Sequence, residues 1–449
     1  MSGDQDALIT SRNVDPAVMD PTGTSTGEAP SPLLRIRSAV TRHLPFLIVF
    51  VGAKAVALLG FLLLARVAGG YVFGGVELAL SAGLMAATAG LLGLPGGVTR
   101  LALVMDERRI ADLLSFAAAC VAVPATLLAV ATLSLGGSAL WALVLACCAL
   151  ASFQLVASSF ARIRSLPLLN SLVDPFTVLV ILALAAPLWL MGQLTLAGMA
   201  VLTTIAAGVT SVAVVWIHLI KRRPGFASSY ARAIRISLPM LAMSGVMLLA
   251  SMGLRPALGI RFRLEDLALY ALCFRLMAPC MLIHQIITTG FFARIYGSSE
   301  AMFDRLMASM IVLYSVVIVV LWAAMPQVIR LGFPSYADGA STIMPLFPLV
   351  GLSVVFWIVS AMLEMMAGRH GVAGRVALWG YPVFGLCLGA FLLLGTFNLV
   401  EATALFDAAL AIFIFVQLFA LYRGGAKFPL AAVALSAPIA VCAGLSLVS

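Results

Sequence analysis

Long apolar stretches separated by short polar loops make up nearly all of the chain after residue 43. Each stretch has about the 20 residues that a helix needs to cross a hydrocarbon core of about 30 Å. None shows the alternation of apolar and polar residues that a membrane β-strand requires. The pattern therefore predicts an all-α polytopic membrane protein. Its thirteen predicted spans are 44–66, 74–98, 113–134, 139–160, 168–190, 194–218, 237–258, 266–292, 303–325, 341–366, 374–396, 401–422 and 428–447.

The basic residues between these spans predict their orientation. Lys and Arg collect in the cytoplasmic loops of membrane proteins. With a cytoplasmic N-terminus, nineteen loop Lys and Arg residues lie on the cytoplasmic side and four on the other side. This asymmetry supports the set of thirteen spans and predicts a cytoplasmic N-terminus. The four outer residues are Arg66, Arg261, Arg263 and Arg330.

Composition agrees with this interpretation and excludes other classes. The chain is 63% hydrophobic and 10% charged, whereas soluble domains are roughly 45–50% apolar and about 25% charged. The net charge of +9 comes from small basic groups between spans, so it does not indicate a nucleic-acid surface. All seven cysteines lie in apolar segments without a CxxC pair, which predicts neither a disulfide framework nor a zinc site.

Changes in polarity divide the chain into segments. Residues 1–43 are too polar to form a core and are predicted to be a disordered cytoplasmic tail with a basic flank. The basic loop 219–236 separates a predicted six-helix bundle, 44–218, from a second one, 237–422. Residues 428–447 form an additional predicted helix. Both halves begin with a Leu-Pro pair and an apolar span, and duplicated halves around a central site are common in transporters.

Several basic residues lie within or at the ends of apolar spans and need an explanation. A Lys or Arg at the centre of a membrane helix costs roughly 2.5–3.5 kcal/mol on insertion scales. We interpret Lys54, Arg275, Arg255 and Arg66 as candidates for a cationic, water-filled cavity that binds an anionic cargo. Snorkelling to the interface is an equal alternative for Arg255, and Arg66 has an interfacial position.

Acids embedded in the spans provide possible ion-pair partners for Lys54. They are also candidates for ion coupling. Lys54 could form an ion pair with Asp174, Glu364 or Asp407 on a neighbouring helix. The same three acids are candidates to carry a coupling H⁺ or Na⁺, because burial favours protonation and a change of access releases the ion. Asp174 precedes Pro175, so a helix-start position is its alternative role. His284 is interpreted as a core histidine.

Diffuse patterns of Gly, Pro, Arg and Tyr mark several helix ends, in the segments 64–74, 93–100, Leu238-Pro239, 255–259, 269–271, Arg275-Leu276, 331–333, Tyr336-Ala337 and Gly368-Arg369. These segments resemble the polysaccharide exporters, the O-antigen and exopolysaccharide flippases of the multidrug/oligosaccharidyl-lipid/polysaccharide (MOP) exporter superfamily. The resemblance covers most of residues 40–425. The family often has an acid just before the arginine at the end of helix seven, whereas Leu254 precedes Arg255 here.

The resemblance implies two six-helix bundles facing a central cavity, with twelve or fourteen helices. It also implies a flippase in the bacterial inner membrane. The cargo would be a polyprenyl-pyrophosphate-linked oligosaccharide, moved to the outer leaflet by alternating access and handed to polysaccharide polymerase or export partners. Fixed cations suit such a cargo, since Arg binds phosphate oxygens bidentately.

Two other classes of function compete with this hypothesis. A glycan polymerase or glycosyltransferase needs paired carboxylates or His in an outer loop, but the longest outer loop, 326–340, has one acid, Asp338, and no His. A cation-coupled multidrug antiporter of the same superfamily should have an acidic cavity for cationic cargo. The sequence therefore predicts a non-enzymatic flippase with no catalytic residue, metal or cofactor. Membrane lipid is a further predicted partner of the chain.

Overall fold

The computed structural model describes residues 32–97, 101, 107–164, 166–221, 226–290 and 297–448. Phe46–Ser449 forms one compact unit, and its first helix begins before it, at Pro32. Its regular elements are helices: α1 (Pro32–Gly90), α3 (Glu107–Ser134), α4 (Ala139–Ile163), α5 (Pro167–Val173), α6 (Phe176–Leu190), α7 (Leu196–Lys221), α8 (Phe226–Met252), α9 (Leu254–Arg261), α10 (Leu264–Gly290), α12 (Glu300–Gly332), the 3₁₀ helix η2 (Pro334–Gly339), α13 (Ala340–Arg369), α14 (Ala373–Leu394), α15 (Leu399–Arg423), α16 (Pro429–Ala434) and α17 (Ser436–Val448).

These helices confirm the predicted all-α polytopic fold. Within the described part of the chain, ten helices are long and apolar enough to cross a membrane. Helix α8, which bends by 51° between Leu238 and Met240, adds an eleventh. Every one of the thirteen predicted spans overlaps helical residues. The first two, however, belong to one long element, and the fifth, seventh and thirteenth are each divided between two helices.

The first two predicted spans are joined without a loop. The stretch Ile48–Gly90 has 43 residues, and at 1.5 Å per residue it would measure about 64 Å if straight, twice a hydrocarbon core. The chain breaks at Gly69, whose φ of 70° and ψ of 167° are not helical. Glycine adopts this conformation because it has no Cβ. We call the residues of α1 before Gly69 its first arm and those after it its second arm.

The fifth predicted span is divided into α5 and α6. Asp174 caps the C-terminus of α5, and Pro175 stands immediately before α6. Proline has no N–H to continue the helical bonding pattern, so the helix breaks there. This break leaves backbone polar groups inside the protein, and the side chain of Gln154 bonds them.

Most of the predicted linker 219–236 is helical. Helix α7 reaches Lys221 and α8 begins at Phe226. Ala233 is buried, and Tyr230 and Ile236 pack against the same apolar cluster. This one-sided burial makes the start of α8 amphipathic, which explains why a strongly basic stretch is helical. The division of the chain into two functional bundles at this point stays a prediction.

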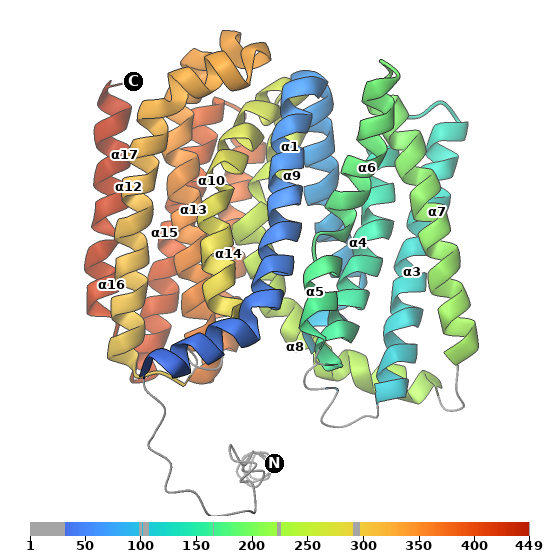
Figure 1. Cartoon of the computed structure of the whole chain (residues 1–449), viewed down its shortest axis with the longest axis horizontal. Coiled ribbons are helices and arrows are strands. Elements are labelled where there is room, and N and C mark those ends of the chain that lie inside the picture. Colours follow the sequence, from blue (N-terminus) through green and yellow to red (C-terminus); the bar gives the residue numbers. More distant parts are fainter. Residues whose placement is uncertain are drawn as a thin grey trace, which may run out of the picture. The chain divides into compact units, whose positions relative to one another are not determined.

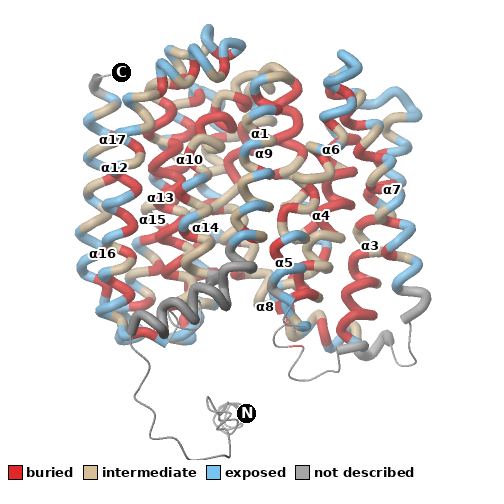
Figure 2. Tube along the Cα trace, in the orientation of Figure 1, coloured by how far each residue is buried: buried red, intermediate tan, exposed pale blue. Residues whose placement is uncertain are grey.

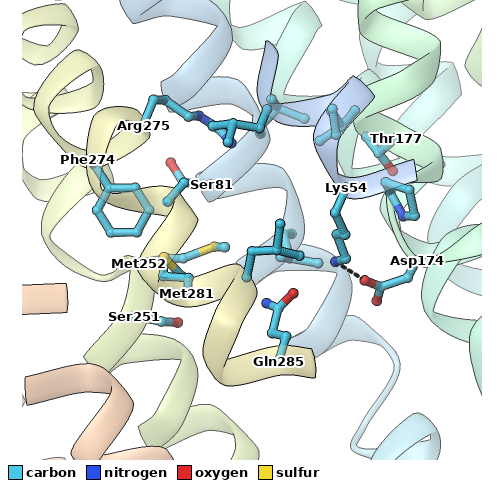
Figure 3. Close-up of a pocket in the computed structure, with 18 of the residues that line it drawn as sticks. Lys54, Ser81, Asp174, Thr177, Ser251, Met252, Phe274, Arg275, Met281 and Gln285 are labelled. Atoms are coloured by element: carbon cyan, nitrogen blue, oxygen red, sulfur yellow. Dashed lines mark hydrogen bonds and ion pairs between the residues drawn. The ribbon is translucent and has the colours of Figure 1, made fainter. Parts of the chain in front are cut away.

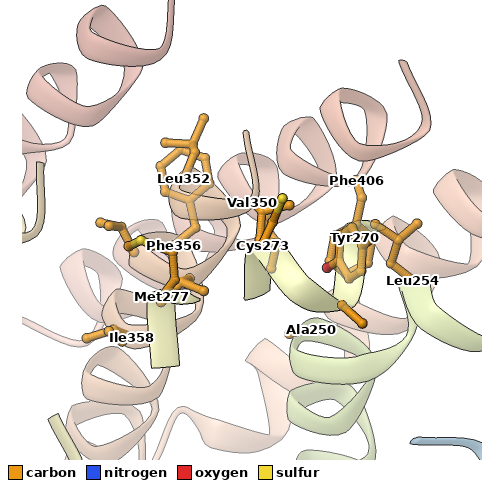
Figure 4. Close-up of a cluster of buried hydrophobic side chains, with 14 of the residues drawn as sticks. Ala250, Leu254, Tyr270, Cys273, Met277, Val350, Leu352, Phe356, Ile358 and Phe406 are labelled. Atoms are coloured by element: carbon orange, nitrogen blue, oxygen red, sulfur yellow. The ribbon is translucent and has the colours of Figure 1, made fainter. Parts of the chain in front are cut away.

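Two groups of helices surround the middle of the molecule (Figure 1). In the first half, α3, α4 and α7 pack against one another, and α5 and α6 lie against α4. In the second half, α13 packs against α10, α12 and α15, and 83% of its apolar stretch is buried. Its Val350 and Phe356 meet Cys273 and Met277 of α10 in one apolar cluster (Figure 4).

The outward faces of the helices are exposed (Figure 2), and many of the exposed residues are large and apolar. On α7, Ile205, Val209, Val212 and Trp216 follow helical spacing and are 59%, 68%, 70% and 65% exposed. In water such a stripe would be unfavourable, but against lipid tails it costs nothing. The stripe therefore marks a surface that faces the bilayer.

A charged cavity between the two halves

A cavity of about 310 Å³ lies where helices of both halves meet (Figure 3). The first half contributes both arms of α1, α4 and the α5–α6 break, and the second half contributes α8, α9, α10 and α13. Most of the wall is apolar. The polar residues on the wall are Lys54, Ser81, Gln154, Asp174, Thr177, Ser251, Arg255, Arg275 and Gln285.

One face of α10 forms much of the second-half wall. Arg275, Ala278, Leu282 and Gln285 line the cavity and recur at the three- and four-residue spacing of a helix face. At 1.5 Å per residue, the cavity follows α10 for about 15 Å from Arg275 to Gln285. Along α10 the wall thus has a guanidinium group, that of Arg275, at one end and the amide of Gln285 at the other.

Lys54 forms an ion pair with Asp174 (Figure 3). Asp174 is one of the three partners predicted for Lys54, and both side chains line the cavity. The lysine side chain is 20% exposed and the aspartate side chain is 38% exposed. This pair therefore joins the first arm of α1 to the α5–α6 break within the first half and remains open to the cavity.

Gln154 of α4 holds the α5–α6 break in place. Its amide nitrogen donates to the carbonyl oxygen of Asp174, and its Oε1 accepts from the backbone N–H of Thr177 at 3.0 Å. One side chain thus bonds groups on both sides of the break, which would otherwise be unsatisfied inside the membrane. This arrangement fixes the position from which Asp174 reaches Lys54.

Arg255 and Arg275 share one buried acid, Glu77. Glu77 lies on the second arm of α1 and is 0% exposed. Its Oε1 accepts from Nε of Arg275 at 2.6 Å, and its Oε2 accepts from Nη1 of Arg255 at 3.4 Å. The two arginine side chains are 17% and 4% exposed, and both line the cavity. This cluster, Glu77–Arg255–Arg275, connects the first half to the second.

Aromatic rings cover the flat faces of both guanidinium groups. The Arg255 guanidinium carbon lies 4.1 Å from the centre of the Phe274 ring. The Arg275 carbon lies 4.1 Å from the centre of the Phe61 ring. Such cation–π contacts stabilise a desolvated cation by up to about 2 kcal/mol. The rings also fix the planes of the guanidinium groups, so their edges remain available for hydrogen bonds.

The structure places the other predicted residues away from the cavity wall. Arg66 is exposed and is not part of the lining. Asp407 of α15 is 4% exposed, and its Oδ1 accepts from Ser353 of α13. Glu364 of α13 forms no ion pair with any residue that the structure describes. His284 is buried with its ring centroid 5.7 Å from that of Trp357, and its Nδ1 has no hydrogen-bond partner among the described residues. The roles of Asp407 and Glu364 in ion coupling stay predictions.

Sequence reasoning missed Glu77, the residue that organises the cationic end of the cavity. The signal was present, since Glu77 is the one acid in the predicted span 74–98. The criterion that selected Glu364 and Asp407 therefore applies to it equally. The sequence alone did not show which residues pair with Glu77, because Arg255 and Arg275 are 178 and 198 residues away from it in the chain. Arg255 is paired with an acid on α1, whereas its neighbour in the sequence, Leu254, is apolar.

The acids and thiols do not form a metal centre in the part of the chain described. No group of three or more His, Cys, Asp or Glu side chains lies close enough to hold an ion among these residues. Chemically, the cavity wall offers two arginines, one lysine, one acid and several neutral polar groups, and Glu77 is bound to the two arginines behind the wall. Such a set can bind, orient and desolvate an anion.

Comparisons with known proteins show which fold this is. Neither the scan against protein-family models nor the search of curated proteins found a match. A multidrug resistance MATE family transporter of the MOP superfamily in its inward-facing conformation superposes with a TM-score of 0.53. The identity is 14%, and the alignment covers 85% of this chain and 94% of that one. The chain therefore shares the fold of MOP-superfamily transporters.

Two further solved structures align at lower scores. The eukaryotic MATE transporter AtDTX14 is 16% identical, with a TM-score of 0.42 over 92% of this chain and 100% of that chain. The outward-facing conformation of a multidrug resistance MATE family transporter is 15% identical, with a TM-score of 0.41 over 95% and 100%.

Proposed function

We propose that this chain is an alternating-access transporter for an amphipathic anion. The specific cargo in this proposal is a polyprenyl-pyrophosphate-linked oligosaccharide, flipped from the inner to the outer leaflet of a bacterial inner membrane for polysaccharide synthesis. The observation that carries the proposal is the charge of the cavity wall, which has three cations, Lys54, Arg255 and Arg275, and one acid, Asp174.

The buried cations support an anionic cargo on energetic grounds. Each one costs free energy within the membrane, and one carboxylate, Glu77, cannot satisfy the donors of two guanidinium groups. Nε and Nη2 of Arg255 are buried and have no hydrogen-bond partner in the described part of the chain. A phosphate or pyrophosphate group brings several charged oxygens that match the edges of guanidinium groups.

The size of the cavity suits a head group. About 310 Å³ is at the lower end of the ~300–1,000 Å³ of small-molecule sites. This volume accommodates a pyrophosphate with a sugar, while Gln285 and Ser251 on the wall offer hydrogen bonds to hydroxyl groups. An apolar tail of the cargo would remain among the exposed apolar side chains that face the bilayer.

The fold supports movement of the two halves around this site. Both halves contribute residues to one cavity, and transporters with duplicated halves expose such a site to each side of the membrane in turn. Asp407 and Glu364, which are embedded in the second half, are the candidates for H⁺ or Na⁺ coupling in this proposal.

A multidrug-type antiporter is the second candidate, and the fold comparison favours it. The transporter with the TM-score of 0.53 is described as a multidrug resistance MATE family protein. A cavity with a largely apolar wall and an accessible acid, Asp174, could accept a cationic drug. The excess of basic residues on the wall argues for the anionic cargo.

A flipping assay distinguishes the two candidates. The purified chain is reconstituted in liposomes with a fluorescent polyprenyl-pyrophosphate-linked sugar, and the flipped fraction is measured by chemical quenching of the outer leaflet. Arg275→Gln should reduce the rate about 10–100-fold through loss of charge-assisted hydrogen bonds. Arg66→Gln is the matched control, since Arg66 is exposed outside the cavity. Transport of a cationic dye but not of the lipid probe would overturn the proposal in favour of the antiporter.

A further inference from the structure

Glu77 is already bound to the two arginines that the cargo is proposed to use. It reaches them from the other half of the chain, and its carboxylate is completely buried. Both of its oxygens accept hydrogen bonds from second-half arginines, at 2.6 Å and 3.4 Å. One carboxylate on α1 therefore ties that helix to both α9 and α10.

The carboxylate of Glu77 satisfies only some of the hydrogen-bond donors of Arg255 and Arg275. Nε and Nη2 of Arg255 are buried without a partner among the described residues. Arg255 is 4% exposed, and it lines the cavity together with Arg275. Glu77 thus occupies an anion site that could hold a ligand with more oxygens and more charge.

We infer that Glu77 is an internal competitor for this anion site, so that binding of the anionic head group breaks the link between the halves. This inference rests on the proposed function. When a pyrophosphate takes the edges of Arg255 and Arg275, Glu77 loses its partners. A buried carboxylate without a partner is strongly unfavourable, so the second arm of α1 moves until Glu77 reaches water. Binding and separation of the halves are then one event.

The linkage follows from differential affinity. A ligand shifts a conformational equilibrium only if it binds one state more tightly than the other. With the halves joined, the head group must displace Glu77, whereas with the halves apart the arginines are free. The anion therefore binds the separated state more tightly, and Glu77 is the positioning residue that creates the difference.

The second ion pair of the cavity provides a matched control. Lys54 and Asp174 both belong to the first half. Loss of this pair changes the charge of the cavity but leaves the connection between the halves unchanged. Asp174→Asn and Glu77→Gln are therefore isosteric substitutions of the same chemical type with different expected consequences.

The test uses inorganic pyrophosphate and the full chain in lipid nanodiscs. Spin labels are attached at Leu135→Cys and Leu393→Cys, which are 86% and 85% exposed and lie on the predicted outer side of different halves. The exposed native Cys120 is replaced by Ser. Pyrophosphate affinity is measured by calorimetry, and the distance between labels by double electron–electron resonance.

We expect pyrophosphate to lengthen the distance between labels in the otherwise wild-type chain. Glu77→Gln should show the longer distance without ligand and bind pyrophosphate at least about fivefold more tightly. Asp174→Asn should keep the short distance. Pyrophosphate binding with no change of distance, or unchanged affinity in Glu77→Gln, would overturn the inference and leave the proposed function standing. Absence of pyrophosphate binding to the wild-type chain would overturn the proposed function itself. If Glu77→Gln does not fold, the wild-type titration decides the inference alone.

Discussion

The two charged clusters of the cavity are built from the same chemistry but differ in location and solvent access. Lys54–Asp174 joins two elements of the first half, with side chains that are 20% and 38% exposed. Glu77–Arg255–Arg275 joins the two halves around a carboxylate that is 0% exposed. An exposed pair contributes little to stability, whereas breaking a buried pair leaves an uncompensated charge. Lys54–Asp174 is therefore a binding element that is open to the cavity, whereas Glu77–Arg255–Arg275 is a link between the two halves.

The largest expected effect is on stability and distinguishes the clusters directly. Arg275→Ala removes the closest partner of Glu77 and should lower the free energy of unfolding by about 3–5 kcal/mol. Lys54→Ala should cost about 1 kcal/mol or less, because its pair is partly exposed. Reversible detergent denaturation of the reconstituted chain measures both. Equal losses in the two variants would remove the distinction between a buried link and an open pair.

The next effect concerns transport and tests whether Lys54 does more than neutralise Asp174. Lys54→Ala should reduce flipping of the lipid-linked probe about tenfold, which corresponds to about 1.4 kcal/mol in the barrier. If Lys54 contacts the cargo, the double variant Lys54→Ala/Asp174→Ala should flip the probe as slowly as Lys54→Ala alone. Recovery of the double variant to near the wild-type rate would instead assign Lys54 a structural role.

Two glycines, one near each charged cluster, differ in how much space surrounds them. A Cβ at Gly74, near Glu77 on the second arm of α1, would lie 1.9 Å from the backbone oxygen of Leu264. Gly74→Ala should therefore separate α1 from α10 at a cost of about 1–3 kcal/mol. A Cβ at Gly52, near Lys54, meets nothing within 4 Å, so Gly52→Ala should be neutral or slightly stabilising. Thermal unfolding of both variants measures the difference, and a neutral Gly74→Ala would contradict the close contact.

The smallest effect on stability is expected away from both clusters. Asp407→Asn keeps an oxygen that can accept the hydrogen bond from Ser353, so it should change stability by less than about 1 kcal/mol. If Asp407 carries the coupling proton, transport by this variant no longer responds to an imposed proton gradient. A full response to the gradient would exclude Asp407 and direct the search to Glu364.

Much of the architecture could be predicted from the sequence because lipid imposes simple requirements. Helices in a bilayer must bond their own backbone groups and present about 20 apolar residues, so the all-α polytopic fold could be predicted from hydropathy alone. Thirteen spans were predicted, whereas the described residues form ten such helices, or eleven with the bent α8. The break at Gly69 falls in the predicted gap between the first two spans. The α5–α6 break was missed, because it depends on Gln154, which bonds both sides of the break from another helix.

For the cavity, the sequence by itself determined which residues needed an explanation. Lys54, Arg255 and Arg275 could be selected by the cost of a charge in an apolar segment, and the structure places all three in the lining of one cavity. Only the tertiary structure decided their partners, since it brings Glu77 against arginines 178 and 198 residues away and leaves Arg66 outside. The physical reason is that a charged residue within an apolar helix can be recognised from the local sequence. Which residue neutralises that charge depends on how separate helices pack.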